Sequence, residues 1–199
     1  LVCDDKGNCA RYVYQKEDDA GFDPTLLHQR NRRQNGQITY TNCYLSEVLY
    51  GNLTPCLHPD AAWPAPADFL FQTVLDYGQY AQAAPCAPTG DWTFRPDAFS
   101  EYKAGFEIRT TRLCRRVLLF HRFAELPGGV ALVKSLDFGY NTALEQGFTF
   151  LNSITSVGYL KKADGSYTQK SLPPLEFEYQ KHAWNTDIQT VAVADLVHA

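Results

Sequence analysis

Short stretches in which apolar and polar side chains alternate recur along the chain. Residues 106–111 read Phe-Glu-Ile-Arg-Thr-Thr, a period of two that is typical of a half-buried β-strand. In residues 117–120, Val-Leu-Leu-Phe, both parities are apolar, which predicts a strand buried on two faces or a bulge that switches faces. Similar patterns predict strands at residues 9–14, 42–50, 69–77, 106–123, 130–140, 149–160, 167–170 and 175–179.

Turn-forming residues separate these stretches. Gly7 and Asn8, and later the run Ala-Asp-Gly-Ser at 163–166, are typical of tight hairpin turns because Gly and Asn tolerate positive φ values. Residues 53–67 and 78–90 are rich in proline or in alanine and proline, and we expect loops there because proline cannot donate to a strand ladder. The sequence therefore predicts a mainly β fold, an antiparallel sheet of about seven to ten short strands with long Pro-rich loops and little helix.

The expected organisation is a single β-rich segment over residues 1–199, with a hairpin and loop in 1–52 and the main sheet in 68–180. Residues 16–37 are polar and predict a long loop with one helical turn. For the tail, residues 181–199, the pattern leaves strand and helix open. Because the chain starts with Leu-Val-Cys and contains no methionine, we expect it to be an excerpt of a larger protein.

Composition narrows the classes of function. The chain carries 18 basic and 22 acidic side chains, and its net charge of −4 predicts no nucleic-acid partner. Its apolar runs fall well short of the ~20 residues that cross a bilayer, so we expect no direct membrane span. Aromatic residues make up 14% of the chain, and we expect most of them to pack in the interior of the sheet.

The cysteines leave two interpretations open. No Cys-x-x-Cys pair occurs, so the spacing is not typical of a zinc site. The ordinary interpretation is that the cysteines are free thiols that pack as small apolar groups. Alternatively, Cys3 and Cys9 flank the first predicted turn and are placed to face each other on a hairpin. The six positions are Cys3, Cys9, Cys43, Cys56, Cys86 and Cys114.

A series of arginines is the main polar feature. It comprises Arg109, Arg112, Arg115, Arg116 and Arg122. A nucleic-acid stripe would be one interpretation, but the negative net charge favours structural ion pairs, since guanidinium binds carboxylate through two parallel hydrogen bonds. The expected partners are Glu101, Glu107, Glu125, Asp137 and Glu178. The structural candidates that follow are Arg109, Arg112, Arg115, Arg116, Glu107, Tyr102 and Cys114.

No catalytic constellation stands out. The five histidines are scattered, and neither a Gly-rich phosphate loop nor a Gly-x-Ser-x-Gly motif occurs. Cys56, His58 and Asp60 could bind a metal from a loop, but we favour a purely structural role for them. Cys114 and His121 could form a nucleophile pair, and here too we favour a structural role. We therefore expect no catalytic, cofactor-binding or metal-binding residues, no cofactor and no enzyme activity.

Several blocks, taken in order, resemble a known family. Residues 5–8, Asp-Lys-Gly-Asn, followed by 12–14, Tyr-Val-Tyr, are similar to a YD repeat of RHS proteins. The most specific block is 99–121, and the set also includes 17–21, 30–32, 50–52, 76–78, 92–97 and 171–179. The chain thus resembles the middle region of the B component of insecticidal Tc toxin complexes, also found in SpvB-type virulence proteins. Leu53 and Thr111 depart from the family pattern.

This resemblance implies a scaffold role. In that family the B component joins a C-type RHS component in a hollow β-sheet shell around a toxic polypeptide, and a β-propeller docks onto the pore-forming A-type component. The chain would be a non-catalytic part of the shell or of its junction with the propeller, secreted with the complex. Its partners would be the remainder of its parent chain and those two components. The alternative is a glycan- or receptor-binding surface module, suggested by the aromatic content and the two Pro-rich loops.

Overall fold

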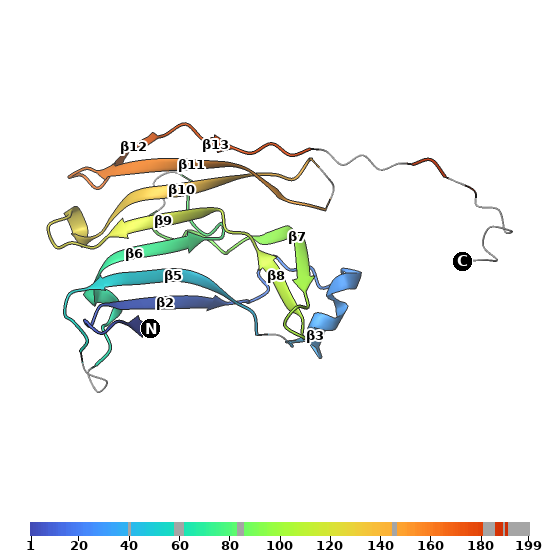
Figure 1. Ribbon diagram of the computed structural model, residues 1–199, viewed down its shortest axis with the longest axis horizontal. Coiled ribbons are helices and arrows are strands. Elements are labelled where there is room, and N and C mark those ends of the chain that lie inside the picture. Colours follow the sequence, from blue (N-terminus) through green and yellow to red (C-terminus); the bar gives the residue numbers. More distant parts are fainter. Residues whose placement is uncertain are drawn as a thin grey trace.

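The computed structural model describes residues 1–39, 41–57, 62–82, 86–144, 147–180, 186–188 and 190, and it is built mainly of β-strands (Figure 1). The strands are Val2–Cys3 (β1), Cys9–Lys16 (β2), Arg33–Gln34 (β3), Gln37–Ile38 (β4), Cys43–Asn52 (β5), Phe69–Asp76 (β6), Phe94–Glu101 (β7), Ile108–Arg112 (β8), Arg116–His121 (β9), Ala131–Asn141 (β10), Phe150–Lys161 (β11), Tyr167–Ser171 (β12) and Leu175–Glu176 (β13). Three short 3-10 helices are Leu27–Arg32 (η1), Pro66–Asp68 (η2) and Pro127–Gly129 (η3).

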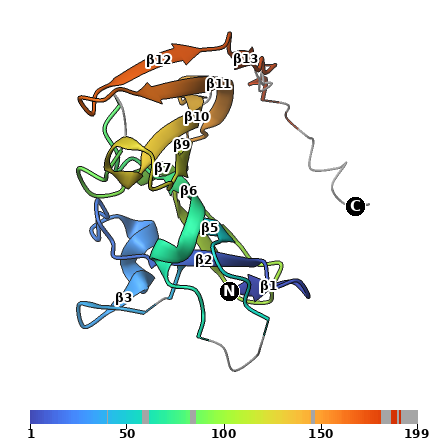
Figure 2. The ribbon, with the colours of Figure 1, turned by 90° about the vertical axis from the view of Figure 1, so that its left-hand side faces the viewer.

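One nine-stranded sheet dominates the fold, in the order β1-β2-β5-β6-β9-β10-β11-β12, with β13 also paired to β11. Every neighbouring pair in it is antiparallel. Figure 2 shows the strands stacked from β2 to β12 with a progressive twist. The predicted fold class, a mainly β antiparallel sheet, is confirmed.

The main core lies on one face of this sheet. Residues directly opposite each other on neighbouring strands point to the same face, so their side chains can form a continuous cluster. Leu118 of β9 lies opposite Val74 of β6, and Phe120 lies opposite Leu132 of β10. All four side chains are buried and form one cluster, against which Tyr80 and other half-buried residues pack. The apolar run at 117–120 therefore belongs to a central strand.

The opposite face of the sheet carries a row of rings. Tyr50 stacks on Phe71 with ring centroids 5.1 Å apart, and Phe71 meets His121 edge-on at 5.3 Å. Not every aromatic residue is interior, however. Tyr12 is 43% exposed and Tyr14 is 58% exposed, so core packing is the wrong explanation for these two rings.

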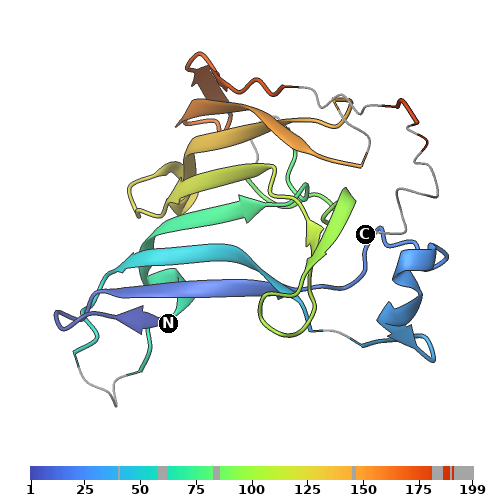
Figure 3. The same ribbon diagram turned by 45° about the vertical axis from the view of Figure 1, so that its right-hand side comes forward.

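A second, two-stranded sheet departs from the predicted pattern. β7 pairs with β8, and Figures 1 and 3 place this hairpin at one end of the main sheet. The single strand predicted over 106–123 is wrong: it is divided into β8 and β9, which lie in different sheets. β7 was not predicted because Pro96 interrupts its alternation and the β7–β8 register shifts between Phe94 and Phe99.

The remaining expectations concern the loops and the tail. The helical turn expected in 16–37 is present as η1, and the loop 163–166 joins β11 to β12. Most of the tail 181–199, where strand and helix were left open, lies outside the described residues. Within the described part of the chain, no helix has the length and apolar character needed to cross a bilayer.

Candidate functional site

A buried ion pair joins the main sheet to the β7–β8 sheet. Arg112 is the last residue of β8, and Glu17 follows the last residue of β2. The guanidinium Nε donates to Glu17 Oε2 at 2.8 Å, and Nη2 donates to Oε1. The two side chains are 0% and 1% exposed. Burying two charges costs free energy. The two parallel hydrogen bonds between the guanidinium and the carboxylate offset that cost.

Further groups saturate both partners of this pair. Glu17 also accepts from the Thr111 hydroxyl at 2.6 Å and from the backbone N–H groups of Asp18 and Asp19. Arg112 Nη1 donates to the Ala20 carbonyl at 2.8 Å and to a second carbonyl in the segment between β6 and β7. The donors and acceptors of the pair are thus occupied by the chain itself.

An aromatic wall covers the pair. The Arg112 guanidinium lies 4.3 Å from the centroid of the Trp92 ring, within the range of a cation–π contact. The Trp92 indole N–H donates to Asp18 Oδ1 at 2.6 Å, and the ring meets Tyr44 edge-on at 5.6 Å. Trp92 is buried, so water is excluded from this side of the ion pair.

A second buried ion pair lies at the end of the β6–β9 ladder, next to the core cluster. Arg116, the first residue of β9, lies opposite Asp76, the last residue of β6, and donates to Oδ2 from Nε at 2.8 Å and from Nη2 at 2.6 Å. Nη2 also reaches the carbonyls of Tyr80 and Ala81. Asp76 Oδ1 accepts from the backbone N–H of Gly78 at 2.8 Å. The pair therefore fixes the loop that follows β6.

The other arginines make separate contacts. Arg109 donates to the Ser100 hydroxyl at 3.0 Å, and Arg115 lies 5.9 Å from the centroid of the Tyr140 ring. Glu107 pairs with Arg32, whose Nη1 donates to Oε2 at 2.8 Å. These residues do not join Arg112 and Arg116 in one convergent site.

The last two candidates, Tyr102 and Cys114, also lie outside the two buried ion pairs. Tyr102 is 65% exposed in the turn between β7 and β8. Cys114 lies between β8 and β9 and donates to the Arg116 carbonyl at 3.3 Å. Burial raises the pKa of Cys114 to about 11, which keeps it a thiol at neutral pH.

The predicted carboxylate partners are wrong for Arg112 and Arg116. Glu107 binds Arg32, Glu101 binds Lys103 at 2.9 Å, and Asp137 accepts from the Ser135 hydroxyl. The true partners, Glu17 and Asp76, stand in two of the blocks that carry the family resemblance, 17–21 and 76–78. Each block begins with an acidic residue, and this is the sequence signal that could have found the partners.

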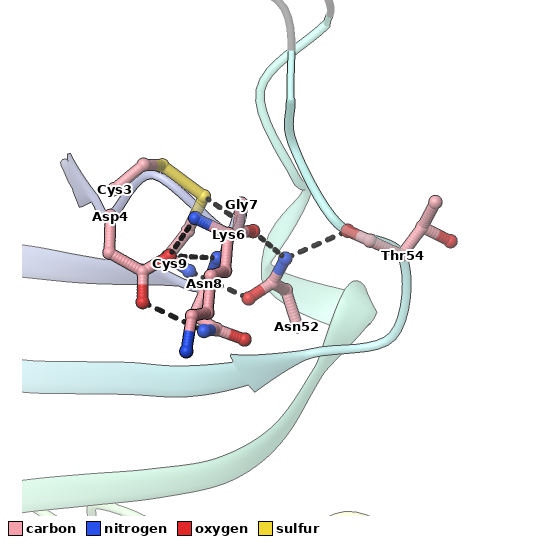
Figure 4. Close-up of a disulfide and its surroundings, with 8 residues drawn as sticks. All are labelled: Cys3, Asp4, Lys6, Gly7, Asn8, Cys9, Asn52 and Thr54. Carbon is pink, nitrogen blue, oxygen red and sulfur yellow. Dashed lines mark hydrogen bonds between the residues drawn. A yellow bond between two sulfur atoms is a disulfide. The ribbon is translucent and has the colours of Figure 1, made fainter.

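The prediction for two of the cysteines is also corrected. Cys3 and Cys9 form a disulfide across the β1–β2 hairpin, so the free-thiol interpretation is wrong for these two (Figure 4). The structure records the other cysteines, Cys43, Cys56, Cys86 and Cys114, as free. The metal-site hypothesis at residues 56, 58 and 60 cannot be placed, because residues 58 and 60 lie outside the described residues.

A surface pocket of about 580 Å³ lies between the end of the β7–β8 hairpin and the loop before β11. It is lined by aromatic rings such as Phe99 and by Arg95, Asp97 and Arg109. Arg95 Nε binds Asp97 Oδ1 at 2.8 Å, and Asp97 Oδ2 accepts from the Thr149 N–H at 2.9 Å. Asp23, the other acidic residue of the lining, accepts from the Thr25 N–H at 2.9 Å, so both acidic groups are already engaged with the chain.

These features define the class of the protein: an open antiparallel β-sheet whose buried charges hold strands and loops together. The chain belongs to the SpvB family, described as Salmonella virulence plasmid 65kDa B protein, whose profile matches residues 1–123. The resemblance inferred from the sequence blocks is confirmed by this match and by similar solved structures.

Among curated proteins, the chain is 40% identical over 113 residues to a mono(ADP-ribosyl)transferase SpvB of Salmonella typhimurium. The match covers 52% of this chain and 19% of that protein, so the chain spans about a fifth of the relative's length.

Two solved structures share the fold. A chain of the Photorhabdus luminescens Tc holotoxin pore is similar with a TM-score of 0.68 and 33% identity, covering 89% of this chain and 8% of that one. The N-terminal domain of effector protein SpvB from Salmonella typhimurium strain LT2 is similar with a TM-score of 0.66 and 33% identity, covering 79% and 49%. The chain is thus related to toxin and virulence proteins.

We predict that Glu17→Gln destabilises the fold by about 3–5 kcal/mol, because it leaves the buried Arg112 guanidinium without its counter-charge. Urea unfolding at pH 7, followed by tryptophan fluorescence, measures the change. The matched control is Glu125→Gln on the surface, which we expect to change stability by no more than about 0.5 kcal/mol. Equal stability of the two variants would show that the buried pair does not hold the sheets together.

The Arg32–Glu107 pair predicts a loss of stability in acid. The hydrogen bond from Arg32 lowers the pKa of Glu107 from 4.5 to about 2. The pKa of Glu107 is lower in the folded state than in the unfolded state. The pair therefore stabilises the fold fully above pH 4.5, and this stabilisation disappears as the pH falls towards about 2. Glu107→Gln should therefore flatten the pH dependence of the urea midpoint in this window. An unchanged slope would contradict the assignment.

Proposed function

We propose that the chain is a non-catalytic wall segment of a β-sheet shell in a toxin-related protein. The observation that carries this proposal is the open edge of the main sheet. β1 covers β2 only at Ala10 and Cys9, and no described strand pairs with the outer side of β2 from Arg11 to Lys16. Unpaired strand edges bind further strands readily, so a wall would continue from here.

The interior of the chain supports the non-catalytic part of the proposal. Glu17, Arg112, Asp76 and Arg116 are buried charges, and their hydrogen bonds end on the chain itself. A catalytic acid or base needs a free lone pair or proton that faces a substrate. The similarity to the N-terminal domain of SpvB supports this role. The relatives named as transferases are several times longer than the chain, so their name describes a much larger protein.

Similarity to the Tc holotoxin pore suggests the partners. The nearest would be the remainder of the parent chain, which continues the sheet at both edges. Beyond it, a C-type RHS component would complete the shell, and a pore-forming A-type component would receive it through the propeller junction. Secretion would occur as part of that assembly.

Hydrogen–deuterium exchange tests the wall proposal by comparing the isolated chain with the longer protein that we expect to contain it. Peptides from β2 and β12 should exchange at least about ten-fold more slowly in the longer protein, because their edges gain hydrogen-bonded neighbours. Peptides from β6 and β9, which are already paired on both sides, are the internal control. Equal exchange of the edge strands in both proteins would refute a continuing wall.

A glycan- or receptor-binding surface is the second candidate, favoured by one observation. Trp63 is 62% exposed and, with Tyr12 and Arg11, lines a shallow pocket of about 310 Å³. Exposed rings of this kind can stack on sugars. A glycan array separates the candidates: we expect no binding from a wall segment, whereas binding that disappears in Trp63→Ala would establish the surface module.

A further inference from the structure

Three sulfur atoms meet at the edge of the main sheet, although their residues are far apart in the sequence. Cys3 and Cys9 form the disulfide of the β1–β2 hairpin, and Cys56 is a free, half-buried thiol in the loop after β5. The Sγ atoms of the three residues all lie within 4.8 Å of one another. A free thiol this close to a disulfide is placed for reaction with it.

Specific hydrogen bonds hold Cys56 at this position. Its backbone N–H donates to the Gly7 carbonyl at 2.9 Å, so the loop is attached to the turn that carries the disulfide. The Asn52 amide donates to the same carbonyl at 2.9 Å and to the Thr54 carbonyl at 2.7 Å, and its Oδ1 accepts from the Cys9 N–H at 2.7 Å (Figure 4). One side chain therefore ties the hairpin to the start of the loop.

Gly7 allows this close approach. Its φ of +79° lies in the left-handed region, and a Cβ there would come within 2.7 Å of the Cys56 backbone nitrogen. Any other residue at this position would therefore push the loop, and the Cys56 sulfur with it, away from the disulfide.

We propose that Cys3, Cys9 and Cys56 form a thiol–disulfide exchange site. The Cys56 thiolate attacks Cys9 Sγ, a Cys9–Cys56 bond forms, and the Cys3–Cys9 bond breaks. The electron pair of the broken bond leaves on Cys3 Sγ, which takes up a proton in place of the one that Cys56 loses. The number of disulfides and of thiols is unchanged, so the step needs no external oxidant or reductant.

Burial selects which sulfur leaves. Cys9 is 3% exposed and packs with Leu49 and Phe69, whereas Cys3 is only half-buried. A departing thiolate is more stable where water reaches it, because burial in apolar surroundings disfavours the charged form. Cys3 is therefore the leaving group, and Cys9–Cys56 is the product.

The exchange would change what is attached to β2. At present the disulfide pins β1, whose backbone pairs with β2 only through Val2–Ala10 and Cys3–Cys9. In the product the loop after β5 is joined covalently to β2, and β1 is held by its few backbone contacts alone. The first residues of β2 then become accessible to another strand.

Disulfide mapping of the wild-type chain tests the proposal. The chain is incubated at pH 8, its free thiols are trapped with N-ethylmaleimide, and it is digested with pepsin in acid, where exchange stops. We expect mass spectrometry to find a Cys9–Cys56 peptide with alkylated Cys3, beside the Cys3–Cys9 peptide. Finding Cys3–Cys9 alone, with Cys56 fully alkylated, would overturn the proposal.

Variants provide an independent readout. In Cys3→Ser, oxidised glutathione should convert Cys9 and Cys56 into a disulfide, whereas in Cys56→Ser only Cys3–Cys9 should be found. Cys43→Ser is the matched control, because Cys43 pairs with Lys16 at the far end of the β2–β5 ladder, and it should map as the wild type does. Failure of folded Cys3→Ser to form Cys9–Cys56 would also overturn the proposal, and circular dichroism reports whether the variant is folded.

Discussion

A guanidinium buried away from water must find an acceptor for its N–H groups, and this requirement organises the junction between the two sheets. Arg112 meets it with the Glu17 carboxylate and with the carbonyls of Ala20 and Trp92. Glu17 and Ala20 lie in the segment after β2 and Trp92 lies before β7, so satisfying one side chain fixes the relative positions of the end of β2, the segment before β7 and the end of β8. The pair does not act alone, because Asn42 donates to the Arg109 carbonyl and the Tyr44 hydroxyl of β5 bonds to Thr111 of β8.

The same constraint acts at the Arg116–Asp76 pair, which lies where the apolar row of the core ends. Asp76 is the last residue of β6 and accepts from the N–H groups of the following turn, while Arg116 collects the carbonyls of that loop. Polar backbone that leaves a sheet beside a core would otherwise be buried without partners. The pair therefore holds the loop against the edge of the core, and its charges stabilise the fold.

The sequence predicted what depends on local pattern and missed what depends on distant partners. Local patterns located β2, β5, β6, β10, β11 and β12, and the apolar run at 117–120 marked the position of β9 without its start, because the side-chain period of a strand is a local property. It missed β7, whose alternation Pro96 interrupts. It also assigned the wrong carboxylates to Arg112 and Arg116, because their partners, Glu17 and Asp76, lie 95 and 40 residues away in the sequence. Thr111, which departs from the family pattern, binds Glu17 directly. The disulfide stayed one of two alternatives because only the hairpin register places Cys3 opposite Cys9.

The buried charges and the open edges have complementary consequences. The charges of the two buried ion pairs are bound within the chain, whereas the backbone of β2 from Arg11 to Lys16 and the exposed rings beside it remain open to another molecule. A strand edge recognises any extended backbone, so it gives attraction without much selectivity. Selectivity must then come from what covers the edge. In this chain β1 covers the first two residues of β2, and it is attached through a disulfide that lies beside a third cysteine, so the proposed exchange would decide whether the open edge of β2 extends to Cys9 and Ala10.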